Sequence, residues 1–165
     1  MKKVSVILGS DSDMEVFRKV SQVLDEFGVC YDRRILSAHR TPDLLKDHVL
    51  QSEREGTLVF IAVAGMSAAL PGVIASHTTR PVIGVPAAAS SPVLGFDSML
   101  SVVQMPPGIP VAAVSVNGGM NAGLLAVEIL ALDDPSLTEK LTSFRAKQRE
   151  RIAVRDEEFR NKGGK

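Results

Sequence analysis

The 165-residue sequence has a single cysteine, Cys30, no tryptophan and one tyrosine. One cysteine excludes a disulfide within the chain, and its place in a predicted strand leads us to expect a small core side chain. So few aromatic rings leave little for single-stranded nucleic acid to stack on. Basic and acidic residues balance at 19 each. We therefore expect neither a nucleic-acid nor an anionic-membrane partner.

The sequence also lacks an apolar run of transmembrane length and an N-terminal signal-peptide pattern. These two absences lead us to expect a cytoplasmic protein. An apolar fraction of 45% argues against disorder, and 165 residues suffice for one α/β domain with a sizeable core. We predict a single domain over 1–165, with an α/β core over 1–134 and a C-terminal helix and tail over 135–165.

Short apolar runs alternate along the chain with patterns of helical period. The predicted strands are residues 4–8, 29–35, 58–63, 82–85 (closed by Pro86) and 111–116. The predicted helices are residues 16–27, 42–50, one entered through 65–75, 97–103, 121–132 and a long charged helix from 135. This alternation predicts a parallel sheet covered on both faces. Ligands of such sheets bind beyond the carboxyl ends of the strands, where the polar and glycine-rich loops of this chain gather.

Residues 9–13, with the sequence GSDSD, follow the first predicted strand and open a helix. They match neither the P-loop nor the dinucleotide-binding fingerprint, but they suit a phosphate group. Glycine lets the backbone approach closely, Ser10 and Ser12 offer hydroxyl groups, and the helix start presents free N–H groups. Asp13 can cap this helix or accept hydrogen bonds from a ribose. A capped helix start without a ligand fits these residues equally well.

His39 and Arg40 place an acid/base group beside a fixed cation, directly before a helix that Thr41 can cap. The cation can neutralise a phosphate, and the imidazole can accept and return a proton. A purely structural histidine is the alternative. We expect His48 to lie on the surface of a helix and His77 at a helix terminus or on the surface. No spacing of ligands indicates a metal site, and no serine lies in a nucleophile elbow.

Six motifs occur in one order along the chain. They are GSDSD (residues 9–13), SAHRTP (37–42), LPG (70–72), PVIGVP (81–86), SVVQMPPGIPV (101–111) and NAGLLA (121–126). Each motif alone is weak, but the ordered set is specific and extends over roughly residues 4–145. The chain resembles the N5-carboxyaminoimidazole ribonucleotide mutase family, also described as the catalytic subunit of phosphoribosylaminoimidazole carboxylase.

The resemblance implies a three-layer α/β/α sandwich with a flavodoxin-like central parallel sheet, and a homo-octamer. It also implies a step of de novo purine (IMP) biosynthesis on a small-molecule ribonucleotide, without a metal or other cofactor. The family's mutase moves a carboxylate from the exocyclic nitrogen of an aminoimidazole ribonucleotide to ring carbon C4. An extensive apolar segment over 58–132, with almost no charge, independently favours a homo-oligomer.

The resemblance assigns a role to each matching position. His39 corresponds to the general acid/base, and the other matching residues bind the substrate. Arg40 and the serines would face the 5′-phosphate, and Asp13 the ribose. The loops 65–69 and 86–91 would enclose the imidazole and the migrating carboxylate. The expected substrate-binding residues are Ser10, Ser12, Asp13, Ser37, Arg40, Gly65 and Ser67.

The sequence departs from the family's pattern in one loop. Many mutases have GGAAHLPG where this chain has GMSAALPG (65–72), so Ala69 replaces a histidine. The run AVAGMS (62–67) leans toward the related carboxylases that use carbon dioxide directly. Those carboxylases usually have lysine directly after the histidine, whereas this chain has Arg40 there. The motifs LPG (70–72) and QMP (104–106) also favour the mutase. We expect the mutase activity; the direct carboxylase and a non-catalytic flavodoxin-like nucleotide-binding module are the alternatives.

Overall fold

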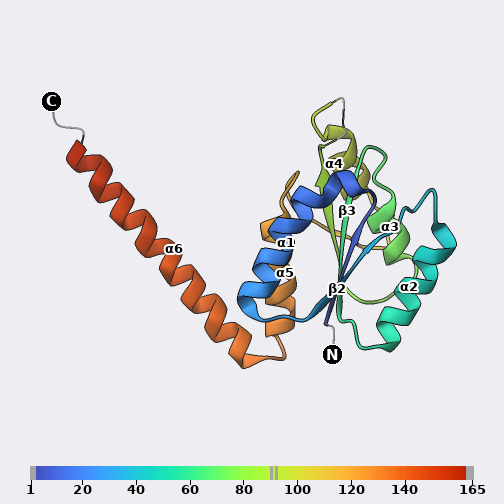
Figure 1. Ribbon diagram of the computed structural model, residues 1–165, viewed down its shortest axis with the longest axis horizontal. Helices are drawn as coiled ribbons and strands as arrows, with labels where there is room; N and C mark the ends of the chain where they lie inside the picture. Colours follow the sequence, from blue (N-terminus) through green and yellow to red (C-terminus); the bar gives the residue numbers. More distant parts are fainter. Residues whose placement is uncertain (1–2, 90, 92, 163–165) are drawn as a thin grey trace. The chain divides into compact units, whose positions relative to one another are not determined.

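Strands and helices alternate along the residues that the computed structural model describes, which are 3–89, 91 and 93–162 (Figure 1). In chain order they are β1 (Val4–Leu8), the 3-10 turn η1 (Asp11–Asp13), α1 (Met14–Phe27), β2 (Tyr31–Ile35), α2 (Pro42–Arg54), β3 (Val59–Gly65), α3 (Leu70–Ala75), β4 (Val82–Ala87), α4 (Phe96–Val103), β5 (Ala112–Ala113), α5 (Gly119–Ala131) and α6 (Pro135–Lys162). The chain divides into two units, one ending at Ile129 and the other beginning at Leu130. The prediction of one domain over 1–165 stays a prediction.

The five strands form one parallel sheet in the order β2-β1-β3-β4-β5. Val6 of β1 pairs with Arg33 on one side and Ile61 on the other. After β2 the chain crosses β1 to add β3 on the opposite side, so the direction of winding reverses between β1 and β3. Ligands of open parallel sheets bind at such a reversal. The predicted flavodoxin-like sheet is confirmed.

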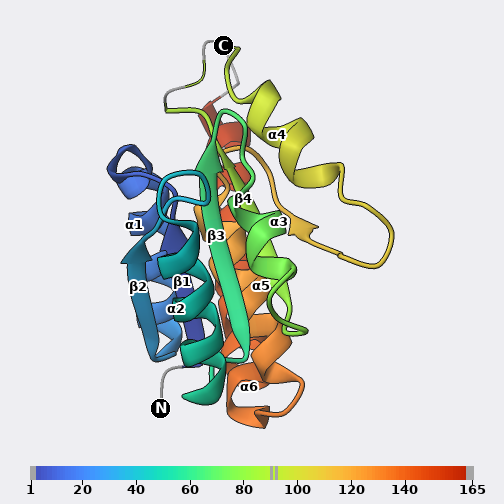
Figure 2. The same cartoon turned by 90° about the vertical axis from the view of Figure 1, so that its right-hand side faces the viewer.

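Helices cover both faces of the sheet. Alternate residues of β3 (Phe60, Ala62 and Ala64) belong to one buried cluster with residues of α2, α3 and α4. Helices α1 and α5 lie on the other face (Figures 1 and 2). Glycines let these two helices approach closely, since a Cβ on Gly123 would lie 2.9 Å from Cβ of Val23 in α1. The predicted three-layer α/β/α arrangement is confirmed.

The structure continues β4 through Pro86, where the sequence predicts that proline closes the strand. The carbonyls of Gly84 and Pro86 accept hydrogen bonds from Val114 and Asn117, so these residues face the β5 side of the sheet. The N–H that Pro86 lacks would point to that same side, where β5 has already ended and no strand is left to accept a hydrogen bond from it. The ladder to β3 therefore continues, and Ala87 still pairs with Gly65. The predicted strand over 111–116 shortens to the two residues of β5 at the sheet edge.

The predictions for Cys30 and His48 are wrong. Cys30 is exposed, because it lies in the turn between α1 and the edge strand β2 rather than in a buried strand. The side chain of His48 is only 9% exposed, and its Nε2 lies 3.0 Å from Oγ of Ser5 and 3.8 Å from Oδ2 of Asp32. Ser5 of β1 and Asp32 of β2 thus provide polar partners for the buried imidazole of His48 on α2. His77 follows the end of α3, as predicted.

Helix α6 is described by itself, as the second unit of the chain. It begins at Pro135, and the carboxylate of Asp134 accepts hydrogen bonds from the backbone N–H and the hydroxyl of Ser136. The predicted long charged helix is therefore confirmed. Among the described residues, no helix is both long enough and apolar enough to cross a membrane.

Gly84 provides a test of packing between the sheet and its helices. A Cβ on Gly84 would lie 2.5 Å from Cγ1 of Val102 in α4 and 3.2 Å from Cβ of Pro71 in α3. We predict that Gly84→Ala lowers the free energy of unfolding in urea by about 1–3 kcal/mol, because overpacking shifts the neighbouring helices. Val102→Ala opens space at the same point, so the glycine substitution should cost less in that background. Equal costs in both backgrounds would contradict this packing.

Candidate active site

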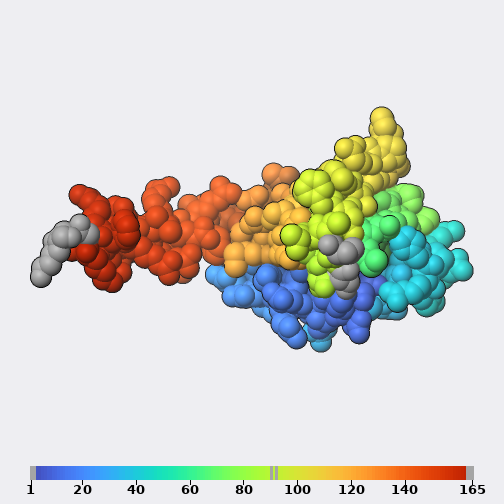
Figure 3. All heavy atoms as spheres, turned by 90° about the horizontal axis from the view of Figure 1, so that it is seen from above, coloured from blue at the N-terminus to red at the C-terminus, as the bar shows by residue number. Residues whose placement is uncertain are grey.

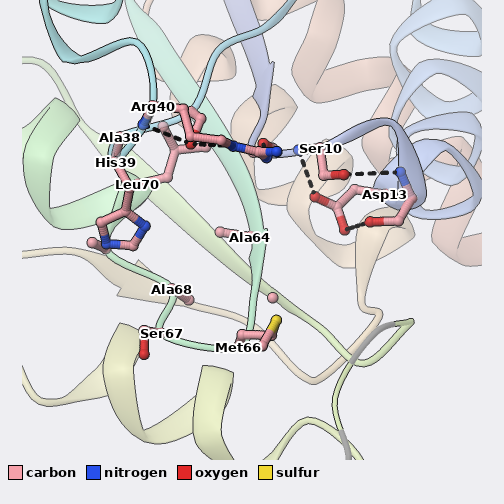
Figure 4. Close-up of a pocket in the computed structure, with 15 residues that line it drawn as sticks. Ser10, Asp13, Ala38, His39, Arg40, Ala64, Met66, Ser67, Ala68 and Leu70 are labelled. Carbon is pink, nitrogen blue, oxygen red and sulfur yellow. Dashed lines mark hydrogen bonds between the residues drawn. The ribbon is translucent and has the colours of Figure 1, made fainter.

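A cavity of about 650 Å³ lies at the carboxyl edge of the sheet, at the reversal between β1 and β3. Three loops line it: the one after β1, the one after β2 and the one after β3 (Figure 4). The same edge is seen in Figure 3, where blue, cyan and green segments of the first unit meet. Segments far apart in the sequence therefore form one site, as the parallel sheet predicts.

The loop after β1 is organised by Ser10 and Asp13. The hydroxyl of Ser10 accepts a hydrogen bond from the N–H of Ser12 at 3.3 Å, and the carboxylate of Asp13 accepts one from the N–H of Ser10 at 3.2 Å. The two side chains thus form a capping box around η1. Asp13 precedes α1 but makes no side-chain capping bond to that helix. One oxygen of Asp13 also accepts a bond from the Ser12 hydroxyl at 3.5 Å.

Burial raises the pKa of Asp13, the side chain of which is almost completely enclosed. The hydrogen bonds from Ser10 and Ser12 oppose this effect but do not reverse it. A carboxylate withdrawn from water weakens the folded state unless it is fully paired. The position of Asp13 at the cavity therefore carries a cost in stability, which is typical of a functional group.

Arg40 joins the loop after β2 to the loop after β1. Its Nη2 donates to the carbonyl of Gly9 at 3.3 Å, and its Nε donates to the hydroxyl of Ser37 at 3.3 Å. The sequence predicts that Thr41 caps α2, but its side chain makes no capping hydrogen bond to that helix. Its hydroxyl accepts from the N–H of Ser37 and donates to the carbonyl of Ser37, which closes the turn that carries His39. In Figure 4 the imidazole of His39 projects toward the loop after β3.

The loop after β3 supplies the apolar part of the cavity, through Met66, Ala68 and Leu70. Gly65 ends β3 where a Cβ would lie 3.1 Å from the carbonyl oxygen of Ala87, so a side chain there would crowd β4. Ser67 lines the cavity, but its hydroxyl turns away from the imidazole of His39 in Figure 4. Ala69, at which the family resemblance leads one to expect a histidine, also lines the cavity.

The structure brings all eight predicted site residues to this one cavity. They are Ser10, Ser12, Asp13, Ser37, His39, Arg40, Gly65 and Ser67. The sequence predicts that the loop 65–69 encloses the substrate, but it gives Met66 in that loop no role of its own, and Leu70 was missed. Apolar residues in a loop carry no chemical signal of their own. The loop 86–91 contributes no described residue to the lining, and Ser90 lies outside the described residues. Enclosure of a substrate by that loop stays a prediction.

The donor set of the cavity is not that of a metal centre. Among the described residues, no group of three or more histidine, cysteine, aspartate or glutamate side chains could hold a metal ion. The groups present are hydroxyls, one carboxylate, one imidazole and one guanidinium. They are suited to holding an anionic, hydroxyl-rich molecule and moving a proton on it.

Comparison with known proteins assigns the chain to a family. The family model described as AIR carboxylase matches residues 3–151, which include every residue of the cavity. The chain belongs to the AIR carboxylase family. The N5-carboxyaminoimidazole ribonucleotide mutase of Methanocaldococcus jannaschii is 47% identical over 157 residues, covering 95% of this chain and 97% of that protein. The Pyrococcus abyssi protein of the same name is 50% identical, covering 88% and 83%.

Two further similar proteins are a longer plant protein and a solved bacterial structure. The chloroplastic phosphoribosylaminoimidazole carboxylase of Vigna aconitifolia is 45% identical, but the match covers only 26% of that longer protein. The crystal structure of Treponema denticola PurE superposes with a TM-score of 0.82 at 29% identity, covering 94% of this chain and 96% of that one. The resemblance drawn from the ordered motifs is thus confirmed.

The raised pKa of Asp13 has a consequence for stability against pH. The folded state binds this proton more tightly than the unfolded state, in which the ordinary pKa is 3.8. The contribution of this group is therefore largest below 3.8 and is lost as the pH rises through the higher folded-state pKa. We predict that Asp13→Asn removes this loss, so that stability falls less between acidic and neutral pH, measured by urea unfolding across that range.

Asp47 of α2 provides a matched control, because it is exposed and its substitution Asp47→Asn changes the charge equally. That variant should keep the pH dependence of the parent. An Asp13→Asn protein with the parent's pH dependence would show that burial of this carboxylate has no such effect.

Proposed function

We propose that this protein is an N5-carboxyaminoimidazole ribonucleotide mutase of purine biosynthesis, an isomerase that moves the substrate's carboxylate from the exocyclic nitrogen to ring carbon C4. The observation that carries the proposal is the convergence of His39, Arg40 and the loop of Ser10 and Asp13 on one cavity. A single cavity of this size can hold a phosphate, a ribose and a heterocycle together. The names of the similar proteins support the same activity.

The binding groups lie where a ribonucleotide would need them. The exposed guanidinium of Arg40 uses one hydrogen bond at Nε and one at Nη2, so other N–H groups remain for a phosphate. Ser10 and Ser12 both line the cavity from the loop after β1. Asp13 presents a carboxylate that can accept hydrogen bonds from ribose hydroxyls. We assign Ser37 to orienting the guanidinium, because it binds Nε, and Gly65 and Ser67 to the end of the cavity that holds the ring.

The reaction needs one group that gives a proton and takes one back. In the first step His39 protonates the carbamate nitrogen, the C–N bond breaks and carbon dioxide leaves. The aminoimidazole is an enamine, so its C4 then attacks the carbon dioxide and forms a C–C bond. His39, now neutral, removes the proton from the sp³ carbon at C4 and restores the aromatic ring. Protons and electrons balance over the cycle, and the imidazole returns to its starting state.

We also propose that the protein is a homo-oligomer, with the octamer that the family resemblance implies. Helix α4 buries Ser98 and Val102 but exposes Phe96, Leu100 and Val103, which recur at the spacing of one helix face. Leu94 is 87% exposed beside them. An apolar stripe of this kind is typical of a surface that a second copy of the chain covers.

Sedimentation tests the assembly. We expect a species much heavier than 17.6 kDa at micromolar concentration. Phe96→Asp together with Leu100→Asp should lower the mass, because burying two charges at the stripe is unfavourable. The substitution Leu44→Asp, at another exposed leucine, provides the control. A parent protein that sediments as a monomer would refute the proposal.

One assay tests the reaction. The enzyme is supplied either with N5-carboxyaminoimidazole ribonucleotide or with aminoimidazole ribonucleotide and bicarbonate, and formation of the C4-carboxylated product is followed. The mutase predicts rapid turnover of the first supply. Turnover of only the second supply would indicate the direct carboxylase, and binding without turnover would indicate a non-catalytic module.

Two substitutions separate the roles of neighbouring residues. His39→Asn should lower kcat by roughly 10²- to 10⁴-fold with little change in substrate affinity, because it removes the proton transfer alone. Arg40→Ala should mainly weaken binding, since a phosphate contact is made equally in the ground and transition states. An active His39→Asn enzyme would contradict the assignment of the acid/base. An Arg40→Ala enzyme that loses kcat at unchanged substrate affinity would contradict the assignment of Arg40 to the phosphate.

A further inference from the structure

Met66 combines two unfavourable features at the mouth of the cavity. Three non-glycine residues of the described chain have a positive φ, namely Met66, Leu94 and Asn117, and Met66 is the one that lines the cavity. Its φ of 53° lies in the left-handed region, which disfavours residues with a Cβ. Met66, an apolar residue, is also 53% exposed. A glycine at this position would remove both costs, so the side chain itself needs an explanation.

The backbone around Met66 is fixed by short hydrogen bonds and close packing. The carbonyl of Met66 accepts a bond from the N–H of Ala68 at 2.8 Å, and the carbonyl of Ser67 accepts one from the N–H of Ala69 at 2.7 Å. On the other side, Gly65 is still paired with Ala87 of β4. The left-handed conformation of Met66 is therefore held by its neighbours, and strain held in this way is typical of functional sites.

The cavity has a polar wall and an apolar wall. The polar wall consists of Ser10, Asp13 and Arg40, whose hydrogen bonds join the first two loops. Met66 lies with Ala64 and Ala68 on the opposite wall, and Figure 4 shows its thioether below Ser10 and Asp13, across the cavity from Arg40. A phosphate and a ribose belong at the polar wall. The apolar wall is left for the ring and for a small uncharged molecule.

Carbon dioxide is the species that such a wall would hold. It carries no charge and has no hydrogen to donate, so it gains little from hydroxyls or a guanidinium. In the proposed reaction it exists between rupture of the C–N bond and formation of the C–C bond. During that interval its escape into water leaves aminoimidazole ribonucleotide as a dead-end product, so the wall beside the reacting ring must be closed.

We propose that Met66 is a positioning residue whose thioether closes the apolar wall over the reacting ring and retains carbon dioxide until C4 attacks it. The inference rests on the proposed function. An unbranched thioether fills irregular space and adapts to a bound molecule. The part of Met66 that is now exposed is then the area that the heterocycle covers, which offsets the unfavourable backbone conformation.

The test measures how turnover divides between two products. Purified enzyme is given N5-carboxyaminoimidazole ribonucleotide, and both the C4-carboxylated product and free aminoimidazole ribonucleotide are quantified. Carbamates lose carbon dioxide unaided in water, so the rate without enzyme is subtracted. The variants are Met66→Gly, Met66→Ala and Met66→Leu. The parent should release little free aminoimidazole ribonucleotide, and Met66→Leu, which keeps the apolar bulk, should behave like the parent.

Met66→Gly and Met66→Ala should raise the fraction lost as aminoimidazole ribonucleotide several-fold. Met66→Gly should also melt at a higher temperature than Met66→Ala, because glycine adopts the left-handed conformation without strain. An unchanged product ratio in both small variants overturns the proposal. So does a change in sedimentation without a change in the ratio, which would make Met66 an interface residue. If the parent itself fails to convert the substrate, the proposed function fails instead.

Discussion

The reversal of the sheet between β1 and β3 is the constraint on which the rest of the structure depends. Because β2 is added on one side of β1 and β3 on the other, the loops that follow these three strands converge at one edge. Covering both faces with helices then makes this edge the place where polar side chains can gather without being buried in the core. The nature of the site follows from which residues occupy three short loops.

Much of this arrangement could be predicted from the sequence, and the exceptions share a cause. Apolar runs and helical periods predicted the order of elements. The motifs at residues 9–13 and 37–42 supplied six of the eight site residues, the loop 65–69 supplied Gly65 and Ser67, and the parallel sheet brings all eight to one cavity. Pro86, Cys30 and His48 were misjudged because each depends on its position in the sheet. Pro86 faces the side where β5 has ended, Cys30 precedes an edge strand, and His48 meets Ser5 across α2 and β1. Local pattern carries no information on such neighbours.

Two residues of the site lower the stability of the fold. Asp13 is a carboxylate withdrawn from water, and Met66 has a strained backbone and an exposed apolar side chain. Buried residues elsewhere in the first unit are almost all apolar, such as Val6, Phe60 and Ile83. A well-packed core therefore offsets a local loss of stability where binding and proton transfer require particular groups.

Arg40 donates hydrogen bonds to the carbonyl of Gly9 and to the hydroxyl of Ser37. The two loops are consequently joined by the protein's own groups, which confine the guanidinium to one orientation. Association then requires little further ordering of the chain, so more of the attraction between cation and phosphate remains as affinity. In the proposed function, the phosphate contacts the guanidinium N–H groups that these two bonds leave, so the arginine is held in place for its ligand by neighbouring loops of the protein.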